Sequence, residues 1–302
     1  MSMSETASAV ASAPRLFGGQ SMAAPLRRVM VRRPAPPVGP DQWRDFGFLH
    51  PVDHALSMRQ HDAFTELLTG AGVDVVVEET DQAGELDAIF AYDPSYITDA
   101  GAILLRMGKP LRRGETDRHA ATYERLGIPI LGRIDAPGTV DGGDAFWLDE
   151  YTLAVGRGYR TNDAGIGQLS DLLAPLGVTV IPVALPHWRG PAECLHLMSM
   201  ISPVAPGLAV VYLPLLATAF VELLQEREWR FVEVPDEEFD SLGCNVLALG
   251  AGRCIAAAGN PVTRQRLEAV GCEVLPYEGS EISLNRAGGP TCLTRPLLRA
   301  ID

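Results

Sequence analysis

The sequence is short of positive charge. Its 25 lysines and arginines are outnumbered by 38 aspartates and glutamates, which gives the 302-residue chain a net charge of −13. Such a chain would be repelled by phosphate backbones and by anionic membrane surfaces. We therefore expect neither nucleic acid nor a membrane as a partner, whereas a small cationic ligand is compatible with the charge.

Cysteine is scarce as well. There are five cysteines, an odd number, and none forms a Cys-x-x-Cys pair, which suits neither a disulfide framework nor a zinc cluster. We therefore expect no bound metal and a reducing, cytoplasmic location. The stretch from Met1 to Pro25 lacks the basic patch and apolar run of a signal peptide, and we predict a flexible N-terminal arm over 1–25.

Long apolar runs and phosphate-binding loops are also missing. The segment from Gly207 to Leu224 is nearly long enough to span a bilayer, but Pro214 and Glu222 interrupt it. It is therefore predicted to be a buried strand, Leu208–Leu213, followed by a helix. No glycine-rich loop of the dinucleotide or Walker type follows a strand candidate, so we expect no cofactor.

What the sequence does contain is a fivefold pattern. Five stretches with helical periodicity end near a glycine or a short turn and lead into a β-rich run. The runs recur at intervals of roughly 40 to 55 residues, which is typical of propeller or solenoid repeats. With the strand candidates between them, each unit reads strand, strand, helix, strand. The five runs are Val73–Val77, Ile128–Leu131, Val178–Val183, Trp229–Val234 and Cys272–Leu275. The other strand candidates are Arg28–Arg32, Ala88–Tyr92, Ala102–Arg106, Thr152–Val155, Val246–Leu249 and Cys254–Ala257.

This pattern predicts one α/β propeller domain of repeated ββαβ units over residues 26–302. The alternative is a single doubly wound α/β sheet, which also alternates strands and helices.

A candidate nucleophile lies near the C-terminus. Two glycines and a proline precede Cys292 in Gly288-Gly289-Pro290-Thr291-Cys292, so we predict that the thiol lies on a tight, irregular loop. A thiol becomes nucleophilic when backbone dipoles, a nearby cation or a cationic substrate lowers its pKa. The alternative, a buried structural cysteine, is our interpretation of Cys244, Cys254 and Cys272, which lie in or beside strand candidates.

A candidate proton carrier lies in Glu193-Cys194-Leu195-His196-Leu197-Met198. We predict that His196 lies in an apolar strand, where a histidine is more often a hydrogen-bonded core residue. Near a reactive cysteine it would instead transfer protons, because its pKa is close to neutral. Cys194 and His196 could share a strand face, but no second Cys/His pair completes a metal site.

Two acidic segments complete the set of candidates. Asp141-Gly142-Gly143-Asp144 is either a simple turn or the source of a carboxylate that orients the histidine. Asp93, in Phe90-Ala91-Tyr92-Asp93-Pro94 at a predicted strand end, is either a cap or turn residue or a fork-like partner for a guanidinium.

These segments, in this order, resemble the guanidine-modifying penteins, and most closely the dimethylarginine dimethylaminohydrolases and their bacterial relatives. The resemblance covers most of the chain from about Arg27 onward. Its anchors are Phe90-Ala91-Tyr92-Asp93-Pro94, Arg106-Met107-Gly108-Lys109-Pro110 with Arg112-Arg113, Asp141-Gly142-Gly143-Asp144, Tyr159-Arg160-Thr161-Asn162, His196-Leu197 and Gly288-Gly289-Pro290-Thr291-Cys292.

The resemblance implies a five-bladed α/β propeller around a central channel that holds the active site, with no metal or organic cofactor. It implies that Cys292 attacks a guanidinium carbon to form a covalent thiouronium, and that His196 protonates the leaving amine and then activates water. The remaining roles that it implies are orientation of His196 by Asp141, guanidinium binding by Asp93, α-carboxylate binding by Arg112 and Arg160, and contributions to substrate binding by Asp87 and Asp144.

Two positions depart from the family pattern. In arginine deiminases and amidinotransferases an aspartate follows the histidine by two residues, and here that position is Met198. A neutral, flexible side chain tolerates a methylated nitrogen but cannot pair with an unsubstituted N–H. Tyr92 stands where the mammalian enzymes place an acid, so the resemblance does not specify how the substrate's amino end is recognised.

The sequence therefore predicts hydrolysis of N-methylated arginine to citrulline and methylamine or dimethylamine. Two alternatives are arginine deiminase-like or amidinotransferase activity on another guanidine, and a non-catalytic guanidine-binding protein. The sequence does not specify the oligomeric state, and a homodimer is left open.

Overall fold

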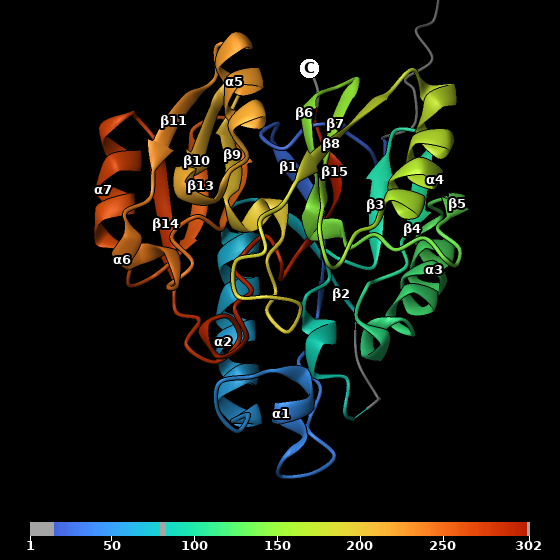
Figure 1. Cartoon of the computed structure of the whole chain (residues 1–302). Helices are drawn as coiled ribbons and strands as arrows, with labels where there is room; N and C mark the ends of the chain where they lie inside the picture. Colours follow the sequence, from blue (N-terminus) through green and yellow to red (C-terminus); the bar gives the residue numbers. More distant parts are fainter. Residues whose placement is uncertain (1–14, 79–82, 301–302) are drawn as a thin grey trace, which may run out of the picture.

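The computed structural model describes residues 15–78 and 83–300, and within these the strands form five separate three-stranded sheets (Figure 1). In each sheet an antiparallel pair is followed by a third strand that lies parallel to the central one. We call each sheet with its connecting helix a blade. The strands, blade by blade, are β15 (Arg295–Arg299), β1 (Leu26–Arg32) and β2 (Asp74–Glu78); β3 (Ser95–Thr98), β4 (Gly101–Leu104) and β5 (Ile130–Arg133); β6 (Ala145–Asp149), β7 (Thr152–Arg157) and β8 (Thr179–Ala184); β9 (Ile201–Ala205), β10 (Leu208–Val211) and β11 (Arg230–Glu233); β12 (Val246–Gly250), β13 (Arg253–Ala257) and β14 (Glu273–Tyr277).

One long helix joins the last two strands of every blade, because a parallel pair needs a crossover connection. In Figure 1, α3, α4 and α7 lie at the periphery, outside their sheets. The crossover helices, in blade order, are α2 (His54–Gly70), α3 (Glu115–Leu126), α4 (Asp163–Leu173), α5 (Thr218–Glu226) and α7 (Pro261–Ala269). Two short helices, α1 (Gln42–Phe46) and α6 (Asp236–Phe239), lie in loops outside this pattern.

The predicted five-unit α/β propeller is confirmed, and the doubly wound alternative is wrong because the strands of residues 15–78 and 83–300 form five separate sheets. All five β-rich runs correspond to the third strand of a blade. The first blade is completed by the end of the chain, because β15 pairs antiparallel with β1 through Leu26↔Arg299 and Met30↔Arg295. This closing strand was not among the strand candidates.

Two predicted strands are wrong. The run Ala88–Tyr92 begins in a 3₁₀ turn, Leu86–Ile89, and continues into a non-helical turn, whereas His196 precedes a second 3₁₀ turn, Leu197–Ser199. Both turns are short and nearly fully buried, so their apolar residues follow neither the helix period nor the strand period. In the sequence, such an uninterrupted apolar run is indistinguishable from a buried strand. Asp93 therefore lies in a turn before β3 and not at a strand end.

The glycines at the helix ends have the expected left-handed backbone. Gly72, Gly127, Gly177 and Gly271 have φ values of 88°, 69°, 72° and 91°. In the fourth unit the same place, directly after α5, is taken by Glu228 at φ 59°. A side chain is strained in this conformation, since Cβ approaches the following carbonyl oxygen.

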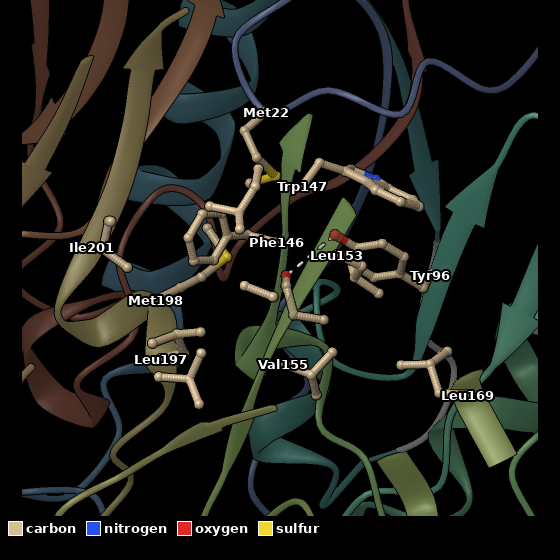
Figure 2. Close-up of a cluster of buried hydrophobic side chains, with 14 of the residues drawn as sticks. Met22, Tyr96, Phe146, Trp147, Leu153, Val155, Leu169, Leu197, Met198 and Ile201 are labelled. Atoms are coloured by element: carbon tan, nitrogen blue, oxygen red, sulfur yellow. Dashed lines mark hydrogen bonds between the residues drawn. The ribbon is translucent and has the colours of Figure 1, made fainter. Parts of the chain in front are cut away.

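The largest apolar cluster lies where the inner strands meet. Figure 2 shows Phe146, Leu153, Met198 and Ile201 packed together with Tyr96, whose hydroxyl donates to the carbonyl of Ala145 at 3.3 Å. Ile201 and Phe146 come from different blades, so the blades share one core. This shared packing gives the loops at the blade ends a fixed relative position.

The predicted arm, 1–25, falls partly outside the described residues. Its remaining part, 15–25, packs on the domain: Gly18 bridges Leu298 of β15, and Met22 is buried in the central cluster. The domain as described therefore begins before the predicted boundary at residue 26, since this segment extends the first blade. The apolar segment 207–224 contains β10 and most of α5 as predicted, and within the described residues no helix is long and apolar enough to cross a membrane.

We predict that Glu228→Gly raises the free energy of unfolding by about 0.5–1 kcal/mol, because glycine relieves the left-handed strain at a small entropic cost. Glu228 is exposed, so little packing is lost. Gly127→Ala is the reciprocal control: it introduces the same strain at φ 69°, where nothing lies within 4 Å of the new Cβ. Urea unfolding of both variants measures the effect, and a destabilised Glu228→Gly would show that its side chain has a stabilising role.

Candidate active site

One loop from each blade converges at the same end of the molecule. Each loop lies just before the first strand of its blade and brings one polar residue to the centre: Asp93, Asp141, His196, Asn245 and Cys292. Asp93, His196 and Cys292 line a common cavity of about 30 Å³, and Asp87, Arg112 and Arg160 also line it. Six of the eight site residues predicted from the sequence therefore line the same cavity.

His196 lies between two carboxylates. Its Nε2 is 3.3 Å from Oδ2 of Asp141, and its Nδ1 is 3.9 Å from Oδ1 of Asp93. Burial alone would lower the pKa of His196, but the charges of Cys194, Asp144 and Asp93 and the hydrogen bond to Asp141 raise the pKa well above its usual value. The imidazole is therefore held in its protonated, cationic form.

Asp141 is completely buried and does not line the cavity. Its Oδ1 accepts the backbone N–H of Gly108 at 2.7 Å, and its Oδ2 accepts Nη1 of Arg160 at 3.2 Å as well as facing His196. These bonds fix the carboxylate beneath the imidazole.

Asp93 is buried yet ionised. Its Oδ1 accepts the N–H of Gly143 at 2.9 Å, and its Oδ2 accepts Nη1 of Arg112. Burial raises the pKa of Asp93, but the charges of Arg112 and His196 outweigh that effect and lower it to about 2. Arg112 also donates to Glu115 and to the carbonyl of Phe90, so most of its N–H groups already have partners within the protein.

Cys292 lies in a tight turn that is closed by the N–H of Leu293 donating to the carbonyl of Gly289. Its sulfur accepts Nδ2 of Asn245 at 3.2 Å. Burial and the charge of Asp93 raise the pKa of Cys292 to about 11, against the opposing effect of His196 and Asn245. In the free protein this thiol is therefore protonated near neutral pH.

A second cysteine lies in the same cavity. The sulfur of Cys194 is 3.6 Å from Nε2 and 4.0 Å from Nδ1 of His196. Burial raises the pKa of Cys194, but His196 and Arg160 outweigh this effect, so the net shift is downward. Sequence reasoning had considered Cys194 only as a metal ligand, and within the described residues no cluster of His, Cys, Asp or Glu could hold a metal ion.

Asp87 is neutralised by two cations. Lys109 Nζ lies 2.6 Å from Oδ2 and Arg286 Nε lies 3.1 Å from Oδ1. Arg286, which also lines the cavity, was not predicted. This corner of the site therefore carries more positive than negative charge.

Asp144 does not line the cavity, so its predicted contact with substrate is not supported by its position. It is fully buried, and it accepts the N–H of Leu197 at 3.0 Å and the hydroxyl of Thr161 at 2.6 Å. Burial raises the pKa of Asp144 to about 6 despite these bonds. Its contacts place it as a support for the turn that carries His196.

The paired glycines are required by close approach. A Cβ on Gly143 would lie 2.2 Å from Nδ1 of His196, and one on Gly289 would lie 2.5 Å from the side chain of Asn245. Neither residue has a positive φ within the described backbone. The glycines in these motifs thus provide space, and Cys292 lies on a tight, irregular loop as predicted.

Met198 and Tyr92 do not reach the cavity. Met198 packs in the central hydrophobic cluster (Figure 2), and the hydroxyl of Tyr92 points to the sulfur of Met22 at 3.8 Å. The argument that Met198 faces a methylated nitrogen is therefore wrong, because the 3₁₀ turn after His196 places Ser199, not Met198, at the cavity wall.

Asn245 was missed from the sequence. The repeat could have revealed it, since Asn245 precedes the first strand of the fifth blade at the same place that supplies a site residue in the other four.

Comparison with known proteins shows which family this chain resembles. The family model described as "N,N dimethylarginine dimethylhydrolase, eukaryotic" matches residues 48–299. A dimethylarginine dimethylaminohydrolase of Streptomyces coelicolor is 32% identical over 92% of this chain and 100% of its own length. The enzyme of that name from Pseudomonas aeruginosa is 31% identical over 80% and 89%.

Solved structures agree with these relatives. A cysteine-to-serine variant of dimethylarginine dimethylaminohydrolase from Pseudomonas aeruginosa, in complex with citrulline, matches with a TM-score of 0.73 and 27% identity, over 89% of this chain and 98% of that one. The N-terminal domain of ArgZ, a cyanobacterial arginine dihydrolase, matches with a TM-score of 0.77 at 19% identity over 90% and 97%, and this likeness concerns the fold alone.

We predict that iodoacetamide labels Cys194 before Cys292 in the ligand-free protein at pH 8. A thiol with a pKa of about 11 is ionised in only about one molecule in a thousand at that pH, whereas the pKa of Cys194 is lowered. Peptide mass spectrometry over time measures the order.

Cys244, Cys254 and Cys272 are buried thiols with raised pKa values and act as slow internal references. Labelling of Cys292 first would contradict the electrostatic picture of the free site.

Proposed function

Because the chain belongs to the N,N-dimethylarginine dimethylaminohydrolase family, we propose that it hydrolyses a guanidine C–N bond of N-methylated arginine, releasing citrulline and methylamine or dimethylamine. The observation that carries this proposal is that the thiol of Cys292, the cationic imidazole of His196 and the carboxylate of Asp93 line one small cavity. Together they provide a nucleophile, a proton donor and a cation-binding group.

Asp93 would bind the guanidinium. Its low pKa keeps it charged, and Arg112 together with the N–H of Gly143 holds it in place. A planar cation pairs well with a carboxylate through two parallel N–H bonds. In this arrangement Arg112 positions Asp93, and its own engagement with Glu115 argues against the α-carboxylate role that the resemblance implied.

The substrate itself would activate the nucleophile. A guanidinium bound beside Cys292 brings a positive charge that offsets Asp93, so the pKa of the thiol falls on binding. The thiolate then attacks the guanidinium carbon to form the C–S bond. Asn245, whose amide donates to the sulfur at 3.2 Å, stabilises the same thiolate.

His196 would supply and recover the proton. As the C–N bond breaks, the imidazolium gives its proton to the departing amine, which leaves a neutral imidazole beside the cationic thiouronium on Cys292. Water then loses one proton to the imidazole and forms the C–O bond. As the C–S bond breaks, the second proton of that water returns to the sulfur, which restores the thiol of Cys292. Nδ1 is the ring nitrogen suited to this proton transfer. Nε2 faces Asp141, whereas Nδ1 faces Asp93 and the guanidinium that Asp93 would bind.

Four further residues would support this chemistry without reacting. Asp141 stabilises the imidazolium and orients the ring, and Asp144 fixes the turn that carries it. Arg160, at the cavity wall, and Arg286, in the positive corner around Asp87, would hold the substrate carboxylate.

Arginine deiminase activity is the main alternative, and an arginine deiminase of Listeria welshimeri is 27% identical over 70% of the chain. The carboxylates at the cavity wall bear on this choice. They are Asp87 and Asp93, and Asp87 is already paired with two cations. One remaining acid suits a guanidine whose other nitrogen is alkylated. The cytoplasmic location and the homodimer stay predictions.

We predict that purified enzyme forms citrulline from asymmetric dimethylarginine with a kcat/KM at least about tenfold above that for arginine. Cys292→Ser should reduce turnover by about a thousandfold or more, since the alcohol is a far weaker nucleophile. Cys272→Ser, which changes a thiol outside the cavity, is the matched control. Citrulline from arginine alone would reject the proposed substrate.

The pH profile of kcat/KM should be bell-shaped, with its maximum on the alkaline side of neutrality. The reactive form needs a Cys292 thiolate, whose share grows as pH rises toward a pKa of about 11, and a protonated His196, which is lost as pH rises through its raised pKa. Asp141→Asn lowers the pKa of His196, so the maximum should move to lower pH and decrease.

Asp163→Asn is the control for this profile, because its carboxylate pairs with Arg157 on the exposed surface. A maximum in the acid range for the unmodified enzyme would be incompatible with this assignment of groups.

A further inference from the structure

A second cavity, of about 290 Å³, adjoins the catalytic one. The two share Cys194, Ser199 and Ala287 as a common wall. We call it the side cavity. It is roughly tenfold larger than the catalytic cavity, which has room for little more than one or two water molecules.

The side cavity touches both reacting groups through one neighbour each. Cys194, in its wall, has its sulfur 3.6 Å from Nε2 of His196. Asn245, also in its wall, donates to the sulfur of Cys292 at 3.2 Å. A group in the side cavity would therefore lie one side chain away from His196 and one side chain away from the sulfur of Cys292.

The walls of the side cavity are mainly apolar. Trp188 and Phe239 form an aromatic corner, with ring centroids 6.0 Å apart and the planes at 90°. Behind Phe239 the ring of Tyr212 stacks at 4.1 Å, and the guanidinium of Arg189 lies 4.4 Å from the Trp188 centroid. The remaining apolar wall residues are Leu49, Leu195, Leu242 and Leu284.

Trp188 holds an unfavourable backbone conformation in this corner. Its φ is 45°, which is rare and unfavourable for a bulky side chain. The cost is offset by the contacts that fix its ring against Phe239 and Arg189. The corner is therefore a built feature and not a loose gap between loops.

The amino-acid end of an arginine derivative does not suit this cavity. Its charged wall residues are Glu193, Asp240 and Arg189, and Arg189 already pairs with Asp240 at 2.8 Å. A carboxylate would meet more negative than positive charge there. The positive groups, Arg160 and Arg286, lie at the catalytic cavity instead.

We propose that the side cavity binds the apolar substituent on the departing nitrogen, so the enzyme accepts N-alkyl and N-arylalkyl guanidines with groups larger than methyl. This inference rests on the proposed function and extends it to a substrate class. The overall reaction is unchanged: guanidinium and water give citrulline and the protonated amine, and the substituent leaves on that amine. A methyl group is too small to use most of the cavity.

The test compares Nω-benzyl-arginine with asymmetric dimethylarginine on the whole enzyme, with citrulline as the product measured. We expect kcat/KM for the benzyl compound to equal or exceed that for dimethylarginine, because burying the ring against Trp188 and Phe239 stabilises the complex. Citrulline from dimethylarginine but none from the benzyl compound would overturn the inference and leave the proposed function intact. No citrulline from either would reject both.

Trp188→Ala should lower the ratio of the two kcat/KM values, benzyl over dimethyl, by about tenfold. Tyr151→Ala, which removes an exposed aromatic ring that lines neither cavity, is the matched control. Leu49→Trp is a second variant, in case Trp188→Ala destabilises its loop. Leu49 is 74% exposed, so we expect the larger ring to be tolerated. The tryptophan would fill part of the side cavity and should also lower the ratio of the two kcat/KM values. A ratio that moves no further in these variants than in Tyr151→Ala would overturn the proposal.

Discussion

The site depends on keeping one cation, the His196 imidazolium, buried between carboxylates. Removing a charge from water costs several kcal/mol unless partners compensate it. Here Asp141 and Asp93 face the two ring nitrogens, and each of them is held by an arginine, Arg160 or Arg112. The arrangement supplies a proton donor at a pH where an unassisted histidine would have lost its proton.

The propeller makes this arrangement geometrically simple. Every blade begins its first strand at the same end of the molecule, so the loop before that strand brings a residue to the site in all five blades. Two of these positions supply acids, one the imidazole, one an amide and one the thiol. The thiol joins this set because β15 pairs with β1 in the first blade. That pairing places the loop with Cys292 beside the other four loops.

The charges also explain how a thiol can be both inert and reactive. Without a ligand, Asp93 and burial hold Cys292 in its protonated form, with a pKa of about 11. A guanidinium supplies the missing positive charge, so under the proposed mechanism the correct substrate switches on its own nucleophile. Cys194 differs because His196 and Arg160 lower its pKa in the free protein. The two thiols therefore have opposite electrostatic environments within one cavity.

The sequence by itself determined the fivefold fold, because the alternation of strand and helix periods with helix-ending glycines repeats along the chain. It also predicted Cys292, His196, Asp141 and Asp93 as site residues from their residue types and ordered motifs, and the structure brings these four together. Only the tertiary structure decided which side chains face the cavity. The structure placed Asp144 behind the turn that carries His196, Met198 in the core and Asn245 beside the sulfur of Cys292. The direction in which these side chains point is set by short turns and by packing between blades, and neither leaves a periodic pattern in the sequence. It also brought Trp188 and Phe239 together across about fifty residues of chain, a contact that no local pattern encodes.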